Sequence, residues 1–351
     1  MKITVVGGGS WGTALAKILA EKGLDIHLLV RREVVCEAIN REKENPFYLP
    51  GIKLPKNLKA TLDPKIAFKD SKTVLWVIPS FALKEVVKKY KKFAEKVPYH
   101  ISGIKGIDLK TEKTPFIILK EELSCDCQIF VLGGPSFAKE VAKGLPTAVV
   151  LAGEKEEETK KMQELLAVPY FRVYRSDDPI GVEIAGALKN VIAIASGISD
   201  GLELGLNARA SLITRGLIEI IRLGTKLGGN LYTFYGLAGM GDLVLTCTGA
   251  LSRNYQVGFR LGKGEKLEDI LIDLRQVAEG VKTAKVVKKF AKKFEVELPI
   301  CEEVYRVLYK NESPKTCLKR LLSRSLKKEF EDISSKKMDR LKYVTNEDHK
   351  L

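Results

Sequence analysis

The sequence predicts an α/β domain with a mostly parallel sheet covered by helices on both faces, followed by an all-α domain. Short apolar runs alternate with helical windows over residues 1–178, and this alternation is typical of parallel sheets. From Asp178 onward the pattern changes to helices alone. The 351 residues, 45% of them hydrophobic, suffice for two domains. We expect an α/β ligand-binding domain at 1–178, an all-helical substrate-binding domain at 179–330 and a charged tail at 331–351.

Six apolar runs of the first domain are short enough for strands that are buried on both faces. They cover residues 3–6, 26–30, 74–78, 101–104, 129–132 and 148–151. Helical windows lie between them, most clearly at 12–21, 82–93 and 156–166. The connection 42–56 contains three prolines that interrupt any helix. It is expected to be either a plain surface loop or a lid, and the sequence leaves its motion open.

A Gly-x-Gly-x-x-Gly motif at residues 7–12 follows the first expected strand and opens the first expected helix. Gly7 permits a tight turn, Gly9 lets the backbone approach a pyrophosphate, and Gly12 lets the helix pack close to the sheet. The helix N-terminus offers N–H groups and a positive dipole end to phosphates. The motif predicts a Rossmann-type dinucleotide site; the alternative is a glycine-rich turn without a ligand.

The end of the second strand bears on the choice of cofactor. Arg31 and Arg32 begin 19 positions after Gly12, where NAD-specific sites often carry an acidic residue. Two guanidinium groups favour an adenosine 2′-phosphate through charge-assisted hydrogen bonds. We therefore expect that NADPH is at least accepted. The alternative is a solvated strand end, and the preference between NADH and NADPH stays open.

An isolated lysine stands out in the second half of the chain. Asp178 is expected to cap a helix with Pro179 at its first position. The window 180–199 has only two charged residues, Glu183 and Lys189, so this helix should be buried almost all round. A lysine there needs a partner or a task, and desolvation would lower its pKa towards catalytic use. Catalysis, a snorkelling lysine and a buried ion pair, for example with Glu183, are all consistent with the pattern.

A second glycine-rich segment, at 236–243, ends close to polar residues. Asp242 lies within it, and Ser252, Arg253 and Asn254 follow soon after. Glycine backbone can lie flat against a ligand, an arginine can hold a phosphate with two parallel hydrogen bonds, and an asparagine can donate or accept. The cluster predicts a site for a small anionic, oxygen-rich ligand, although a surface ion pair would also explain Arg253.

Composition excludes several other classes of protein. The net charge is +15, but the lysines are spread along the chain and interleaved with glutamates, which indicates a solvated surface rather than a nucleic-acid site. The positive field would still favour an anionic substrate. Six scattered cysteines and three distant histidines predict no metal site, and the thiols are expected to be reduced. Neither a membrane span nor a signal peptide is expected, so we expect a cytoplasmic protein.

Six blocks taken together resemble the NAD(P)-dependent glycerol-3-phosphate dehydrogenases of the bacterial type, over the chain up to about residue 330. The blocks are residues 7–12, 105–106, 134–140, 183–191, 236–242 with 251–254, and 277–281. The resemblance implies a homodimeric oxidoreductase of lipid metabolism. It implies reversible reduction of dihydroxyacetone phosphate to sn-glycerol 3-phosphate by NADPH or NADH, which supplies glycerol phosphate for phospholipid synthesis.

The resemblance and the patterns above together suggest roles for individual residues. Lys189 takes the acid–base role. Substrate-binding positions are Lys105, Gly134, Ser136, Asp242, Ser252, Arg253 and Asn254. Cofactor-binding positions are Gly7, Gly9, Ser10, Trp11, Gly12, Arg31, Arg32, Lys105, Ala138, Arg253, Val277 and Glu279. No metal is expected, because the cofactor carries the hydride and the lysine ammonium stabilises the charge that develops on the carbonyl oxygen.

Two other functions remain open from the sequence. A related β-hydroxyacid or 6-phosphogluconate type of dehydrogenase would also pair such a domain with helices and an active lysine, but the block Leu251-Ser-Arg-Asn254 argues against it. A non-catalytic NADP(H) sensor would have less reason to retain Lys189, Asp242 and Arg253 together. Feedback inhibition and the order of the tail cannot be derived from the residues.

Overall fold

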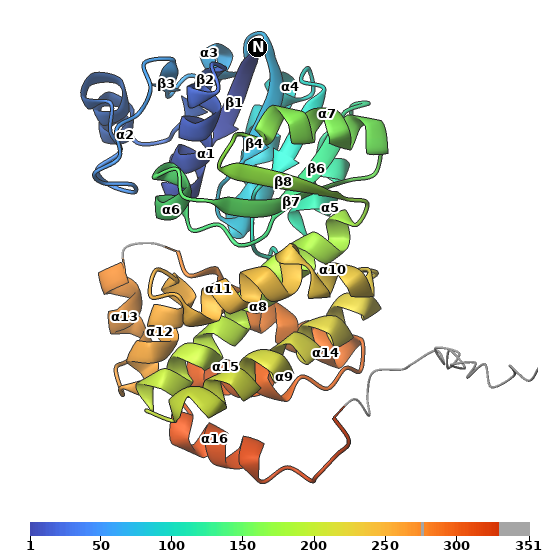
Figure 1. Ribbon diagram of the computed structural model, residues 1–351. Helices are drawn as coiled ribbons and strands as arrows, with labels where there is room; N and C mark the ends of the chain where they lie inside the picture. The colour runs from blue at the N-terminus through green and yellow to red at the C-terminus, as the bar shows by residue number, and fades with distance from the viewer. Residues whose placement is uncertain (275–276, 330–351) are drawn as a thin grey trace, which may run out of the picture.

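The computed structural model describes residues 1–274 and 277–329, so the predicted tail at 331–351 lies outside the described residues. Its first part is built on one eight-stranded sheet with the order β3-β2-β1-β4-β5-β6-β7-β8 (Figure 1). The strands are β1 (Lys2–Val6), β2 (Asp25–Leu29), β3 (Leu58–Thr61), β4 (Ser71–Trp76), β5 (Tyr99–Ser102), β6 (Gln128–Gly133), β7 (Thr147–Gly153) and β8 (Phe171–Ser176). Neighbouring strands run parallel except β6 and β7, so the sheet is mostly parallel, as the sequence predicts.

Helices cover both faces of this sheet because successive strand side chains point to opposite faces. Ile3 and Val5 of β1 belong to a core with α1 and α7, whereas Val6 belongs to a second core with α3, α4 and α5. The helices and helical turns of this part are α1 (Ser10–Glu21), α2 (Glu33–Glu37), η1 (Ala38–Glu42), α3 (Pro64–Phe68), η2 (Ser80–Ala82), α4 (Leu83–Ala94), α5 (Pro115–Glu122), α6 (Ala138–Ala142) and α7 (Glu156–Leu166). The predicted two-sided packing is confirmed.

The sequence did not predict the two edge strands, β3 and β8. The prediction looked for runs that are buried on both faces, and β3 and β8 are instead outer strands with alternating exposure. In β8, Phe171 and Val173 are buried while Arg172 and Tyr174 are exposed. Strands at the edge of a sheet often carry charged residues, because their free edge is exposed to water.

From Pro179 onward, within the described residues, the chain is helical and lies beyond the end of the sheet opposite the N-terminus (Figure 1). The elements are α8 (Pro179–Gly201), α9 (Gly205–Lys226), α10 (Leu231–Tyr235), η3 (Leu237–Gly241), α11 (Asp242–Thr248), α12 (Arg253–Gly262), α13 (Leu267–Leu274), α14 (Glu279–Lys293), α15 (Pro299–Lys310) and α16 (Pro314–Leu322). Helix α8 packs against α9, α11, α12, α14 and α15, and it is therefore the centre of this part.

The start of α8 confirms its predicted cap. The Asp178 side chain accepts a hydrogen bond from the Gly181 N–H at 2.8 Å, and Pro179 occupies the first turn. Within the described residues, α8 is the one helix long and apolar enough to cross a membrane. However, 94% of its apolar window is buried against the neighbouring helices, as expected for a core helix.

The loop after η1 is held against the glycine-rich turn. The Asn45 amide donates to the Gly8 carbonyl at 2.9 Å and to the Thr13 hydroxyl at 2.8 Å. The Ser10 hydroxyl donates to the Tyr48 carbonyl at 2.6 Å. This segment therefore forms a wall beside the turn, and any lid motion stays a prediction.

The cysteines require one correction. Cys125 and Cys127 form a disulfide, so the expectation that every thiol is reduced is wrong for this pair. The other four cysteines are free, and Cys247, Cys301 and Cys317 are buried. Only one residue separates the bonded pair, a spacing that none of the sequence patterns we considered addresses.

Candidate active site

The glycine-rich turn has the shape that a dinucleotide phosphate requires. Gly7 has φ +119°, and a Cβ there would lie 2.2 Å from the Val77 carbonyl oxygen. A Cβ on Gly12 would lie 2.0 Å from the Gly7 carbonyl oxygen, so both positions need glycine. By contrast, nothing lies within 4 Å of a Cβ on Gly9, and no side chain caps the start of α1. Open space and uncapped N–H groups fit a pyrophosphate.

The loops that carry the other candidate residues meet at the same edge of the sheet. They follow the carboxyl ends of β1, β4, β5 and β6, which are parallel neighbours. Ligands of open α/β sheets bind outside the carboxyl ends of the strands. The sheet therefore brings residues 7–12, 77–80, 103–106 and 134–136 to one edge.

Arg31 and Arg32 follow β2, which pairs with β1 next to the glycine-rich turn. Both side chains are exposed. The Arg32 guanidinium lies over the Phe47 ring, 4.9 Å from its centroid, and donates to the Tyr48 hydroxyl at 3.3 Å. The structure thus places both cations beside the turn; their contact with a 2′-phosphate stays a prediction.

The buried lysine is the centre of an ionic cluster. Lys189 of α8 is 5% exposed, and its Nζ donates to Asp242 Oδ1 at 2.5 Å and to Thr246 Oγ1 at 2.7 Å. The second Asp242 oxygen accepts from Lys105 Nζ at 2.9 Å. One carboxylate therefore bridges two ammonium groups, and the cluster carries one excess positive charge.

Lys105 joins this cluster to the sheet. Its Nζ also donates to the Gly134 carbonyl at 2.8 Å and to the Ser136 hydroxyl at 3.2 Å. The structure thus brings five predicted site residues together around Asp242, namely Lys105, Gly134, Ser136, Lys189 and Asp242 itself. The Lys189 side chain is buried and does not point into bulk water. An excess positive charge in a buried site can stabilise a developing oxyanion.

The Lys189 pKa is lowered from its usual value to about 8. Burial is the largest cause, the Asp242 carboxylate opposes it, and the positive charge of Lys105 adds to it. An amine with a pKa near neutral pH can both donate and accept a proton at useful rates.

Lys189 does form a buried ion pair, but its partner is Asp242, so the suggested partner Glu183 is wrong. Both Glu183 carboxylate oxygens accept the Phe116 N–H, at 3.0 and 2.9 Å, at the start of α5. Glu183 and Lys189 are six positions apart, which places their side chains about 120° apart around the helix. Burial raises the Glu183 pKa to about 8, and the carboxyl group holds α5 against α8.

The Asn254 amide is occupied at both ends. Its Nδ2 donates to Asn190 Oδ1 at 2.8 Å, and its Oδ1 accepts the Gly280 N–H at 2.9 Å. Asn190 in turn donates to the Lys105 carbonyl at 3.0 Å. These contacts hold α8, α12 and α14 around the lysine cluster, whereas contact of Asn254 with a substrate stays a prediction.

Glu279 connects the helices back to the sheet. Its carboxylate accepts the Ser80 N–H at 3.0 Å and the Ser80 hydroxyl at 2.7 Å. Burial raises the Glu279 pKa, and the Ser80 hydrogen bonds oppose this shift. The pair fixes the loop after β4 against the start of α14, so Glu279 positions that loop whether or not it also contacts a cofactor.

Arg253 begins α12, next to the Ser252 cap. The Ser252 hydroxyl accepts the Tyr255 N–H at 3.2 Å, which gives it a capping role. The Arg253 side chain is reached by solvent, yet surrounding protein lowers its pKa by desolvation while the Glu279 charge opposes this. Arg253 is therefore a cation that water can reach and that lies near Glu279, and its phosphate contact stays a prediction.

The remaining predicted cofactor positions lie in three segments. Trp11 lies against the end of β5: a Cβ on Gly103 would be 3.2 Å from its indole nitrogen. That nitrogen is buried and has no hydrogen-bond partner within the described residues. Ala138 begins α6, and Val277 is half-buried just before α14. None of these positions has a contact that tests its role.

The sequence analysis missed Thr246, Asn190 and Ser80. Thr246 follows Asp242 by four positions, and the helical spacing could have placed both on one face. Asn190 follows Lys189 directly and was quoted only as part of a motif. Ser80 carries no local signal, because its partner Glu279 is 199 positions away.

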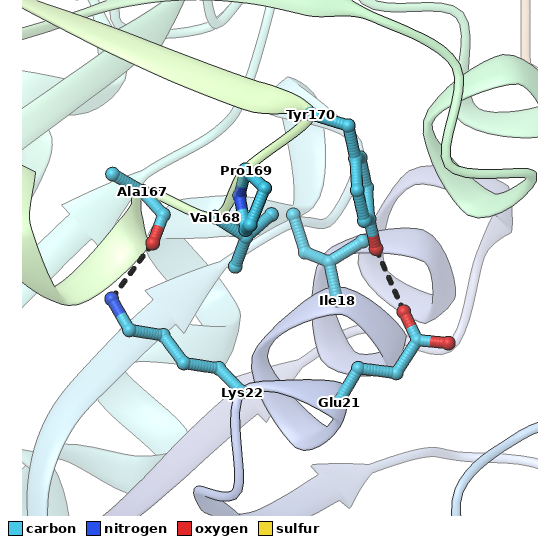
Figure 2. Close-up of a pocket in the computed structure, with 7 residues that line it drawn as sticks. All are labelled: Ile18, Glu21, Lys22, Ala167, Val168, Pro169 and Tyr170. Carbon is cyan, nitrogen blue, oxygen red and sulfur yellow. Dashed lines mark hydrogen bonds between the residues drawn. The ribbon is translucent and has the colours of Figure 1, made fainter.

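A hollow of about 190 Å³ at the other end of α1 is not part of this site (Figure 2). Glu21 and Lys22 line it together with residues 167–170. The Lys22 ammonium donates to the Ala167 carbonyl at 2.7 Å, and the Tyr170 hydroxyl donates to Glu21 at 2.7 Å. These contacts tie the end of α1 to the segment before β8, which is a structural role.

A glycine-rich turn and a buried lysine of lowered pKa, both at the carboxyl edge of a parallel sheet, are typical of the NAD(P)-dependent dehydrogenases. Comparison with known proteins narrows this class. The family model described as the N-terminus of NAD-dependent glycerol-3-phosphate dehydrogenase matches residues 2–159, and that of the C-terminus matches residues 178–319. The chain belongs to the NAD-dependent glycerol-3-phosphate dehydrogenase family.

Individual relatives match over almost their whole length. The chain is 48% identical to a glycerol-3-phosphate dehydrogenase [NAD(P)+] of Solidesulfovibrio magneticus over 94% of this chain and 100% of the relative. It is 47% identical to one of Syntrophobacter fumaroxidans over 94% and 97%. The crystal structure of glycerol-3-phosphate dehydrogenase from Coxiella burnetii superposes with a TM-score of 0.88 at 41% identity, over 92% of this chain and 99% of that one.

Proposed function

We propose that the protein reversibly reduces dihydroxyacetone phosphate to sn-glycerol 3-phosphate with NADPH or NADH. The observation that carries the proposal is the Lys189–Asp242–Lys105 cluster, which lies at the sheet edge that also carries the glycine-rich turn. When bound, the nicotinamide supplies the hydride. The Lys189 ammonium then donates a proton to the oxygen on C2 as negative charge grows there.

The surrounding residues prepare that proton transfer. Asp242 and Thr246 hold Nζ of Lys189 in one place, so its direction is fixed before the substrate arrives. Lys105 adds positive charge, which favours the alkoxide and an anionic substrate. We assign phosphate binding to Arg253, since a guanidinium can form two parallel hydrogen bonds to phosphate oxygens. These steps need no metal ion, because the Lys189 ammonium stabilises the charge that develops on the C2 oxygen.

Arg253→Ala is expected to raise the KM for dihydroxyacetone phosphate at least about tenfold, because a charge-assisted hydrogen bond contributes roughly 1.5–3 kcal/mol. The KM for NADPH should change less. Steady-state kinetics with each substrate varied in turn measures both. Arg172→Ala removes an exposed arginine of β8 and serves as the control. An unchanged substrate KM in the Arg253 variant would refute the phosphate role.

The pH dependence follows from the Lys189 pKa of about 8. Ketone reduction needs the ammonium form, so kcat/KM for reduction should fall above about pH 8, approaching tenfold per pH unit. Alcohol oxidation needs the neutral amine, so it should rise through the same range and then level off. Rates in both directions between pH 6.5 and about 10 measure this. Profiles that move in the same direction would exclude Lys189 as the shared acid and base.

A spectrophotometric assay tests the function itself. NADPH or NADH should be oxidised on addition of dihydroxyacetone phosphate, and the product should be sn-glycerol 3-phosphate. A hydroxyacid dehydrogenase would instead act on β-hydroxyacids or 6-phosphogluconate. A sensor would bind NADPH without oxidising it in the presence of any of these substrates, and either result would overturn the proposal.

Finer features of the proposal rest on the family resemblance. We propose a homodimer in the cytoplasm whose product supplies phospholipid synthesis. The exposed Arg31 and Arg32 support acceptance of NADPH. We further propose a boundary between the cofactor and substrate domains at residue 178, between the end of β8 at Ser176 and the start of α8 at Pro179.

A further inference from the structure

The Cys125–Cys127 disulfide lies at a surface turn, away from the lysine cluster. It belongs to the connection between α5 and β6, and both cysteines are partly exposed. β6 runs from this turn to Gly133, so the disulfide and the Gly134 carbonyl lie at opposite ends of one strand. The pair is therefore independent of the proposed dehydrogenase chemistry.

A hollow of about 250 Å³ opens beside the disulfide. Both cysteines and Asp126 line it, together with Lys120, Glu154 and other residues of the flanking segments. It is smaller than typical drug-sized pockets, and a liquid water occupies about 30 Å³, so a molecule of several heavy atoms fits beside the sulfurs. The space beside the sulfurs is large enough for part of a small thiol.

Stabilisation does not account for this disulfide. Its two cysteines are only two positions apart, and the stabilisation of a cross-link increases with the length of the loop that it closes. A bond that closes so short a loop constrains the unfolded chain little. Both cysteines are partly exposed and line the hollow, by contrast, so a thiol can approach the pair from solvent, which exchange requires.

A metal site does not account for the pair either. A nitrogen of His100 and the two sulfurs lie within 4.8 Å of one another, which resembles a three-ligand set. However, His100 Nδ1 accepts the Trp76 indole N–H at 3.1 Å, and Nε2 lies 3.0 Å from the Val97 carbonyl, to which it can donate. Both ring nitrogens are thus engaged within the core, and the imidazole offers no lone pair to a cation.

We propose that Cys125 and Cys127 form a reversible thiol–disulfide exchange site for low-molecular-weight thiols and their disulfides. A thiolate R–S⁻ attacks one sulfur, the Cys125–Cys127 bond breaks, and the released cysteine thiolate takes a proton from water. A second R–SH, as its thiolate, attacks the mixed disulfide, which releases R–S–S–R and leaves both cysteines reduced. In reverse, the pair gives two electrons and two protons to R–S–S–R, which becomes two R–SH.

The test uses the full-length protein with the single change Cys36→Ser, which removes the one half-buried free thiol. The protein is equilibrated in buffers of reduced and oxidised glutathione, alkylated under native conditions and weighed by mass spectrometry. In excess oxidised glutathione, no cysteine should be alkylated. In excess reduced glutathione, two cysteines should be alkylated. After reoxidation, the number of alkylated cysteines should return to zero. Cys247, Cys301 and Cys317 are buried and should not react.

Two further variants locate the exchange. Cys127→Ser should trap one glutathione on Cys125 in oxidised buffer, and Cys125→Ser should trap one on Cys127, because the resolving thiol is absent.

Two alkylated cysteines in every buffer would show that the disulfide does not form, and no alkylated cysteine in any buffer would show that it does not exchange. Binding of one Zn²⁺ by the reduced protein would identify a metal site. Each of these three results overturns the proposal, and far-UV circular dichroism checks that every variant is folded.

Discussion

Lys189→Ala is expected to lower kcat for dihydroxyacetone phosphate reduction by at least about 100-fold, while NADPH still binds. A positioned general acid contributes roughly 10²–10⁴-fold, and alanine has no proton to donate. The glycine-rich turn lies outside α8, so its phosphate contacts should persist. Steady-state kinetics measures the loss, and NADPH fluorescence titration measures the retained binding.

The matched control is Lys226→Ala, which removes an exposed lysine from α9. That variant should keep kcat within about twofold, as surface changes away from a site usually do little. Because Lys189 carries a buried charge, thermal unfolding of both variants must show that they are folded at the assay temperature. Retention of more than about a tenth of the wild-type turnover by Lys189→Ala would mean that the acid–base role is misassigned.

Asp242→Asn should be the second most damaging change, because it affects both stability and catalysis. Asp242 is 1% exposed and bridges Lys189 and Lys105. Removing one partner of a buried ion pair costs about 3–5 kcal/mol, since the remaining charge is left uncompensated. Urea unfolding at pH 7 measures this loss in the free energy of unfolding.

The same variant has a second readout in its pH profile. The Asp242 charge raises the Lys189 pKa against burial, so its removal should lower that pKa below about 8. The decline of kcat/KM for reduction should therefore move to lower pH. Asp273→Asn is the control, because Asp273 is 64% exposed and pairs with Arg260 at the surface. It should cost no more than about 1 kcal/mol. Equal stability losses in the two variants would contradict the buried-pair account.

The sequence predicted those features of the site that are local in the chain. The turn at residues 7–12, the Asp178 cap and the burial of Lys189 each follow from a few neighbouring residues and from helical or strand periodicity. Whether Lys189 pairs with Glu183 could not be decided in this way, because its actual partner Asp242 lies 53 positions away. The side chains of Ser80 and Glu279 are likewise brought together only by the packing of helices on the sheet edge.

The two edge strands and the disulfide were not predicted from the sequence, for a related reason. β3 and β8 face water on one side, so they lack the continuous apolar run that marks central strands. Cys125 and Cys127 are close in sequence, but whether their thiols meet depends on how the turn after α5 folds. In each case the structure that forms depends on the three-dimensional environment of the residues rather than on their types alone.

A crystal structure of the protein with NADP⁺ and sn-glycerol 3-phosphate would test most directly whether the Lys189 amine is the acid and base. We predict that Nζ of Lys189 lies within about 3.2 Å of the oxygen on C2, with the phosphate held by the Arg253 side chain. A substrate whose C2 oxygen lies beyond hydrogen-bonding distance of Lys189 and is bound instead by another residue would contradict the mechanism.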